Sequence, residues 1–428
     1  MPGIVEYIKK FGTETMKERS FSTEDALVLC QFSYLKFDNL LETMSREPVS
    51  VKNLFEDPNS ESLFLDDKYK RDRKKQLKNM VESKRFSDIK LMFYVNRIEA
   101  PNQLNDETQN VLPEKTQSMI SEKAQDETQF CAVTFEIPDY GYFIAFRGTD
   151  ETIVGWQEDF RLALAKPVKG QKLSAKYINE VASKLEGTIS VGGHSKGGNL
   201  ALYSTMHADA KVLDRIEKIY SFDGPGFRPE LLKEYNYEAI REKVVSVIPK
   251  SSVVGLLMST DSKTIVVHAN SIGPMQHNPY TWLLKRGRFS TAEVTQTHLT
   301  LVNAFNDWVY SLDEEQAKRF VHVLEEILAA TGAETTLQIS AELVKSARNV
   351  FKRSQELDEE SEQFLEFLLS SYYELTKDRL KAEFTEKIDS IGKDAKSFID
   401  GFGEDAKLKL AELGEKAQEA VASGRKKH

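Results

Sequence analysis

Short apolar segments alternate with segments of helical periodicity between residues 130 and 270. Residues 130–137 and 142–146 are rich in β-branched and aromatic side chains and flank the turn formers at 138–141, which predicts a strand hairpin. Four more apolar runs follow, with helices expected at 174–185, 199–208 and 229–242: GTISVGG (187–193), IEKIYSF (216–222), VVSVIP (244–249) and TIVVHAN (264–270). Buried strands separated by helices are typical of a mostly parallel sheet covered on both faces, so the sequence predicts an α/β fold.

The parts of the chain before and after this core are expected to be mainly helical. Residues 1–129 are expected to form an N-terminal helical part with a polar loop at 101–129, and 22–35 have the pattern of a buried helix capped by Ser22 and Asp25. The α/β core is expected at 130–312. Beyond it the apolar strands stop, which predicts a helical region at 313–375 and a long amphipathic helix at 376–428.

The composition excludes several classes of protein. The 58 basic and 67 acidic side chains give a formal net charge of −9, so no nucleic-acid partner is expected. No apolar run approaches the roughly 18 residues of a membrane-spanning helix, and the N-terminus lacks the pattern of a secretory signal. We expect the protein to be cytoplasmic or peripheral to a membrane. Export, if it occurs, is expected to proceed without a signal peptide. Cys30 and Cys131 are expected to be buried thiols.

The segment GHSKGG (193–198) lies between a predicted strand and a predicted helix. In this context a G-x-S-x-G sequence is a nucleophile elbow, because the small residues let the backbone turn sharply enough to raise the Ser195 hydroxyl above the sheet. The helix N-terminus that follows favours developing negative charge. A second strand ends in Arg147-Gly148-Thr149, which can offer a backbone N–H and a hydroxyl to such a charge.

These motifs together resemble a bacterial lipase-like α/β-hydrolase family of unassigned function, a relative of the class 3 (fungal-type) lipases. The resemblance covers roughly residues 20–335 and is carried by FRGT (146–149), GW..DF (155–160), GHSKGGNLA (193–201), FDGPGF (222–227) and QHNPYTW (276–282). It implies an α/β-hydrolase fold with Ser195 as the catalytic nucleophile. It also implies an oxyanion hole formed by Thr149 and the backbone N–H of Lys196.

The catalytic base should follow the last strands, because the chain order on this fold is serine, acid, histidine. His277 lies in the turn-rich segment GPMQHNPYTW and is the favoured base. His298 is the alternative, since class 3 lipases carry their histidine in a similar late position. His268 is expected to be a histidine of the core or the sheet, and His194 is expected to point away from the serine.

The catalytic acid is assigned to Asp223, which follows the strand IEKIYSF on the edge where the serine is expected. Class 3 lipases instead place an aspartate after the strand that corresponds to VVSVIP, where this chain reads Lys250-Ser251-Ser252-Val253. The alternatives are Asp261, or no acid and a histidine oriented by Ser252 alone.

The leading interpretation is a serine carboxylester hydrolase, of the lipase or phospholipase type, that cleaves acyl lipids through an acyl-enzyme. No cofactor or metal is expected, because the chain has no phosphate-loop motif and no closely spaced cluster of histidines and carboxylates. Two other functions stay open. One is an effector exported without a signal peptide, whose C-terminal helices bind small helical partner proteins. The other is a non-catalytic lipid-binding module.

The C-terminal segment contains an eleven-residue repeat: GKDAK at Gly392, GEDAK at Gly403 and GEKAQ at Gly414. Three helical turns per eleven residues keep an apolar stripe on one face of residues 376–428. Such a helix is suited to lie on a membrane surface or to pack against its own domain or a partner.

If residues 376–428 form a helix at a lipid surface, deleting them should preserve hydrolysis of a soluble ester but lower turnover on vesicles, because only capture at the interface is lost. Kinetics of the full chain and the truncated chain on both substrates test this. A C-terminal segment that binds neither neutral nor anionic vesicles, yet becomes helical with a protein partner, would contradict it.

Overall fold

The structure is a computed structural model that describes most of the chain up to residue 312. The described residues are 2–40, 47–65, 67, 69–99, 128–148, 167–252, 254–258, 262–271, 273–294, 296–312 and 316. The chain forms two compact units, Met1–Val294 and Thr295–His428. The second contains the described helix α12 (Gln296–Ser311). Apart from residue 316, the regions expected to be helical at 313–375 and 376–428 lie outside the described residues. Within the described part, no helix is long and apolar enough to span a bilayer.

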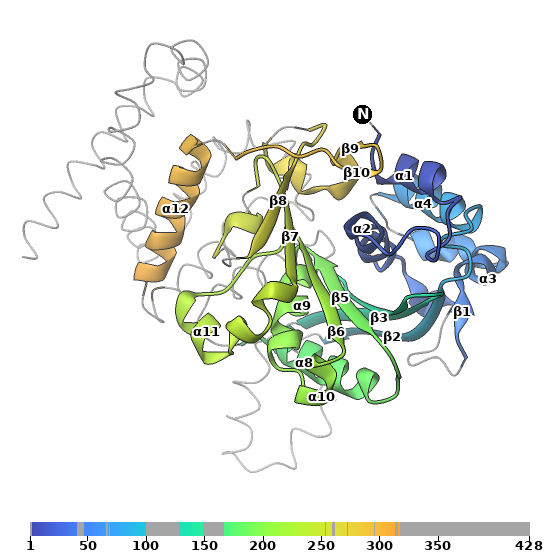
Figure 1. Ribbon diagram of the computed structural model, residues 1–428, viewed down its shortest axis with the longest axis horizontal. Coiled ribbons are helices and arrows are strands. Elements are labelled where there is room, and N and C mark those ends of the chain that lie inside the picture. The colour runs from blue at the N-terminus through green and yellow to red at the C-terminus, as the bar shows by residue number, and fades with distance from the viewer. Residues whose placement is uncertain are drawn as a thin grey trace, which may run out of the picture. The chain divides into compact units, whose positions relative to one another are not determined.

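The first unit is built on an eight-stranded sheet whose strands lie side by side in chain order (Figure 1). These are β1 (Val49–Ser50), β2 (Lys90–Glu99), β3 (Thr128–Ile137), β4 (Gly141–Phe146), β5 (Ile189–His194), β6 (Ile216–Phe222), β7 (Val244–Pro249) and β8 (Lys263–Val267). Strands β1 to β4 pair antiparallel, whereas β4 to β8 pair parallel. The predicted α/β fold with a mostly parallel sheet is therefore confirmed.

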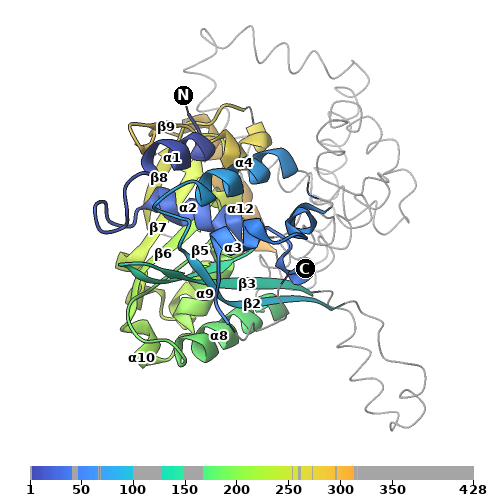
Figure 2. The same cartoon turned by 90° about the vertical axis from the view of Figure 1, so that its right-hand side faces the viewer.

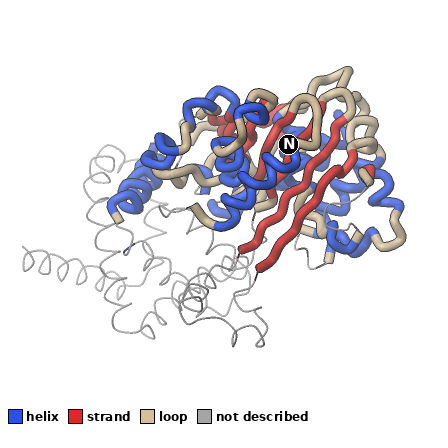
Figure 3. Tube along the Cα trace, turned by 90° about the horizontal axis from the view of Figure 1, so that it is seen from below, coloured by secondary structure: helices blue, strands red, loops and turns tan. Residues whose placement is uncertain are grey.

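Helices cover both faces of the sheet (Figure 3). Alternation along β4 directs Phe143 and Ala145 into one buried cluster and Ile144 and Phe146 into the other. The first cluster is covered by the N-terminal helices, which lie in front of the strands in Figure 2: α1 (Ile4–Phe11), α2 (Thr23–Phe32), α3 (Val51–Glu56) and α4 (Lys70–Val81). The second is covered by α8 (Lys169–Ala182), α9 (Lys196–Met206), α10 (Ala210–Leu213) and α11 (Pro229–Glu234).

Most predicted elements are present, with three differences. Helix α11 ends at Glu234 rather than at 242, because Asn236 takes a left-handed conformation (φ 55°) and short 3-10 turns follow. Strand β2 is not indicated by the alternation pattern, and its partner β3 is distant in sequence. Strand β8 ends at Val267, so His268 follows the strand and is exposed. The expectation of a core or sheet histidine at position 268 is therefore wrong.

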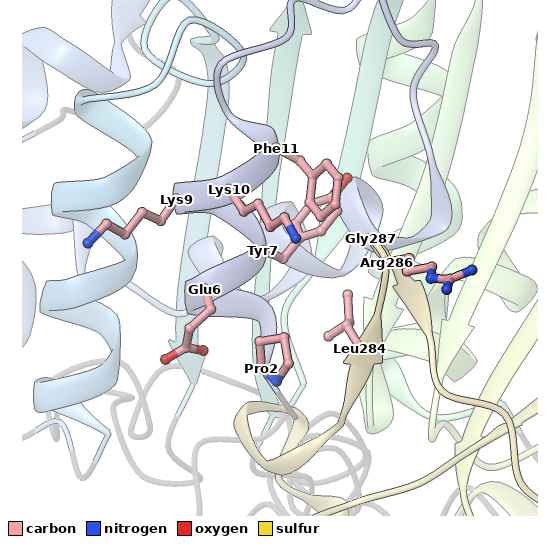
Figure 4. Close-up of a pocket in the computed structure, with 9 residues that line it drawn as sticks. All are labelled: Pro2, Glu6, Tyr7, Lys9, Lys10, Phe11, Leu284, Arg286 and Gly287. Atoms are coloured by element: carbon pink, nitrogen blue, oxygen red, sulfur yellow. The ribbon is translucent and has the colours of Figure 1, made fainter.

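A small hairpin, β9 (Leu284–Lys285) and β10 (Arg288–Phe289), follows the sheet. Its two turn residues, Arg286 and Gly287, both have positive φ, as a two-residue hairpin turn requires. The hairpin contacts α1, and the backbone N–H of Leu284 donates to the Pro2 carbonyl at 2.8 Å. Between them lies a cavity of about 360 Å³ (Figure 4), lined by Pro2, Glu6, Tyr7, Lys9, Lys10, Phe11, Leu284, Arg286 and Gly287.

A buried ion pair holds the N-terminal layer together. The guanidinium of Arg85 donates to both carboxylate oxygens of Asp25, at 2.8 and 2.5 Å, and both side chains are fully buried. The same guanidinium donates to backbone carbonyls between residues 14 and 20, including Thr15 at 3.0 Å and Arg19 at 2.7 Å. Asp25 also caps α2 through Ser22, as the sequence predicts. One pair therefore connects α2, the 12–20 loop and the end of α4.

Replacing Arg85 by methionine should lower the free energy of unfolding by about 3–5 kcal/mol, because the Asp25 carboxylate is left buried without its partner. Urea denaturation followed by circular dichroism measures the change. The matched control is Lys52→Ala, which removes the exposed Lys52–Glu56 pair and should leave the midpoint unchanged. Equal effects of the two substitutions would contradict the role assigned to Arg85.

Candidate active site

Ser195 occupies a sharp turn between β5 and α9. Its backbone has φ 59° and ψ −131°, a conformation that L-residues rarely adopt. Glycines make the turn sterically feasible: a Cβ on Gly193 would lie 2.1 Å from the carbonyl carbon of Gly197, and one on Gly197 would lie 2.1 Å from the Phe146 carbonyl oxygen. The segment GHSKGG therefore has the backbone geometry of a nucleophile elbow.

The chain that follows β4 lies against this elbow at Gly148. A Cβ on Gly148 would be 2.5 Å from the His194 carbonyl oxygen and 3.2 Å from the Ser195 Cβ. Thr149, the expected hydroxyl donor of the oxyanion hole, lies outside the described residues. Lys196 is the first residue of α9 and is buried, so its backbone N–H belongs to the first turn of that helix.

Asp223 follows β6 directly, as Ser195 follows β5. The two strands are parallel neighbours (Figure 1), with His194 in register with Phe222. The Ser195 backbone N–H donates to the Phe222 carbonyl at 2.9 Å, so the backbones of Ser195 and Asp223 lie at the same edge of the sheet. The position of Asp223 follows from strand order, because the carboxyl ends of parallel strands meet at one edge.

The carboxylate of Asp223 binds the imidazole of His277. The Nδ1 atom of His277 donates to Asp223 Oδ2 at 2.6 Å, and the carboxylate is almost fully buried. His277 ends a 3-10 helix at Gly273–His277. With its proton on Nδ1, a neutral His277 has its lone pair on Nε2, the atom that acts as base in a serine hydrolase. Within the described part of the chain, neither that Nε2 nor the Ser195 hydroxyl has a hydrogen-bond partner.

The second oxygen of Asp223 is held by the loop after β7. The Ser252 hydroxyl donates to Asp223 Oδ1 at 2.5 Å, and the Gly255 backbone N–H donates to the same oxygen at 3.1 Å. This loop is the segment in which class 3 lipases carry their aspartate. Here it supplies hydrogen-bond donors to an aspartate from the neighbouring strand, so the structure brings Ser252 and Asp223 together.

Of the alternative residues His268, His298 and Asp261, only His268 has a side chain within the described part of the chain. His268 is exposed beyond β8. His298 lies on α12 in the second unit, as its predicted helix requires, but its side chain and Asp261 are outside the described residues. The described residues contain no group of three or more histidine, cysteine or acidic side chains that could hold a metal ion. The cavity in Figure 4 is lined by none of Ser195, Asp223 and His277.

His194 contacts the backbone of His277 and Tyr34 contacts His194, and no sequence pattern indicates these two contacts. The Nε2 atom of His194 lies 2.8 Å from the His277 carbonyl oxygen, and its Nδ1 lies 3.2 Å from the Tyr34 hydroxyl. No spacing signal identifies Tyr34, since it is 160 positions away from His194 in the chain. The His194 side chain reaches the backbone of His277, a contact that the sequence analysis did not anticipate.

The chain is similar to the Mbeg1-like family over residues 114–326. This match includes Ser195, Asp223 and His277. No curated protein matches the chain. Among solved structures, the crystal structure of M37 lipase resembles it with a TM-score of 0.33 and 14% sequence identity, covering 55% of this chain and 70% of that one.

The short bond between His277 and Asp223 predicts a proton resonance far downfield of the backbone amides, because the Nδ1 proton is shared with a buried carboxylate. Proton NMR of the wild type and of Asp223→Asn tests this, and the signal should disappear in the variant. The control is Asp209→Asn, at an exposed aspartate before α10, which should retain it. A wild-type spectrum without such a signal, at low temperature and across neutral pH, would contradict the arrangement.

Proposed function

We propose that this protein is a serine hydrolase that cleaves carboxylic esters of acyl lipids through an acyl-enzyme. The observation that carries the proposal is the 2.6 Å bond from His277 Nδ1 to Asp223 Oδ2, formed at the sheet edge where the elbow presents Ser195. The chain order of the three residues, serine, acid, histidine, is the order of the α/β-hydrolase triad.

In the proposed mechanism, Ser195 Oγ attacks the carbonyl carbon of the ester while His277 Nε2 accepts the hydroxyl proton. Asp223 stabilises the imidazolium through Nδ1. The tetrahedral intermediate collapses when the C–O bond to the alcohol breaks and His277 returns the proton to the departing oxygen. His277 then activates a water molecule, which attacks the acyl-enzyme and releases the carboxylic acid and the free serine.

The negative charge of the tetrahedral intermediate needs hydrogen-bond donors that are already in place. The Lys196 backbone N–H is suited to this role because it belongs to the first turn of α9, at the positive end of the helix dipole. Thr149 is proposed as the second donor, since Gly148 before it lies against Ser195. Asp223 is buried, and its second oxygen accepts hydrogen bonds from the neutral donors Ser252 and Gly255. The carboxylate therefore interacts with His277 rather than with water.

An acyl lipid is proposed as the substrate on two grounds. The combination of FRGT, GHSKGG and QHNPYTW motifs resembles a lipase-like family, and residues 376–428 have the eleven-residue apolar periodicity of a helix at a lipid surface. A protein that acts at a bilayer from its surface needs no spanning helix. The alternative is that the apolar face of the same segment binds small helical partner proteins.

Ser195→Ala should lower turnover of a short-chain nitrophenyl ester by about 10⁶, because the nucleophile is lost while the small side chain leaves the fold intact. The same variant should no longer be labelled by a fluorophosphonate probe. The matched control is Ser204→Ala, on α9, whose hydroxyl donates to the Ala201 carbonyl; it should retain both activities. Hydrolysis retained by a clean Ser195→Ala preparation would refute the proposal. A panel of glycerides and phospholipids then identifies the substrate.

A further inference from the structure

His194 is a buried histidine that the proposed mechanism does not use. It is the last residue of β5 and directly precedes Ser195. Its ring lies 4.6 Å from the ring of His277, measured between centroids, and its Nε2 lies 2.8 Å from the His277 carbonyl oxygen. The residue before the nucleophile is therefore bonded to the backbone of the candidate base.

The hydrogen-bond partners determine which tautomer His194 adopts. A carbonyl oxygen can only accept, so the proton of a neutral His194 must lie on Nε2. Its Nδ1 then accepts the O–H of Tyr34 at 3.2 Å. Tyr34 follows α2, and the guanidinium of Arg73 on α4 lies over its ring at 4.8 Å. The N-terminal layer thus orients the His194 ring.

His194 is expected to stay neutral while His277 changes charge. Burial lowers the pKa of His194 well below its usual range, and the positive charge that His277 gains on protonation lowers it further. A neutral imidazole offers one donor and one acceptor. It is therefore suited to hold the backbone of His277 and unsuited to compete with His277 for protons.

The segment that carries His277 is a short 3-10 helix outside the named strands, and contacts such as the bond from the Ser251 backbone N–H to Gln276 Oε1 help to hold it. Two consecutive carbonyls in it accept from ring N–H groups: Gln276 from the buried indole of Trp282 at 2.7 Å, and His277 from His194. The first bond comes from Trp282, six residues after Gln276. The second is made to the residue that is covalently joined to Ser195, so it sets the distance between nucleophile and base.

We propose that His194, oriented by Tyr34, is a positioning residue that holds the backbone of His277 in register with Ser195. The inference rests on the proposed function, which supplies the roles of Ser195 and His277. A base that is displaced by a fraction of an ångström loses turnover rather than substrate affinity, since proton transfer depends steeply on geometry.

The test compares His194→Met, which removes the donor at similar volume, with His194→Gln, whose amide can place an N–H near the original Nε2. His194→Met should lower kcat by about 10–100-fold with KM within twofold of wild type. His194→Gln should recover most of the loss. The control is His207→Met, since His207 makes the same kind of bond, from Nδ1 to the Tyr203 carbonyl at 2.9 Å, away from the site; its kcat should be unchanged.

The downfield Nδ1 proton of His277 provides a readout that does not need activity. It should shift or broaden in His194→Met and return toward the wild-type position in His194→Gln. Wild-type kcat and an unchanged proton signal in His194→Met would overturn the inference. If that variant does not fold, Tyr34→Phe replaces it, and an unchanged kcat and signal there would overturn the inference equally. A wild type that neither hydrolyses esters nor binds fluorophosphonate refutes the proposed function instead, while the proton signal still tests the contact.

Discussion

The buried carboxylate of Asp223 is the interaction on which the site depends. A charge removed from water is tolerated only when hydrogen-bond donors replace the lost solvent. The loop after β7 provides the Ser252 hydroxyl and the Gly255 N–H, and the segment before Trp282 provides His277 Nδ1. The hydrogen bonds to this one carboxylate therefore hold two loops that lie outside the named strands. They also place the imidazole of His277 near the end of β6.

Strand order makes this arrangement compatible with the elbow. Because β5, β6 and β7 are parallel neighbours, the residues that follow them meet at one edge of the sheet. The helix after the elbow fastens the loop after Asp223, since the Asn199 amide donates to the Pro225 and Gly226 carbonyls at 3.1 and 2.9 Å. Ser195 and Asp223 are thus held by two sets of bonds, one in the sheet and one from α9.

The N-terminal layer contributes more than a cover for the sheet. Its helices bury one face of β4 and β6, and the buried pair of Asp25 and Arg85 joins α2 to the turn after α4. The same layer carries Tyr34 to within 3.2 Å of His194. A part of the chain without a catalytic motif therefore reaches the backbone of His277 through the buried imidazole of His194.

The sequence by itself determined the elbow, the strands from β3 to β8 and the class of fold, because these depend on local periodicity and on glycines that a tight turn requires. It also indicated Asp223 and His277 as acid and base, from their places after predicted strands. Only the tertiary structure decided how Asp223 is held when this chain has Ser252 after β7 instead of the carboxylate of the family pattern, because Ser252 and Asp223 meet through strand order rather than spacing. The same holds for β2, whose hydrogen-bond partner is distant in the chain. It holds most clearly for Tyr34 and His194, whose contact spans 160 residues and leaves no periodic signal in either segment.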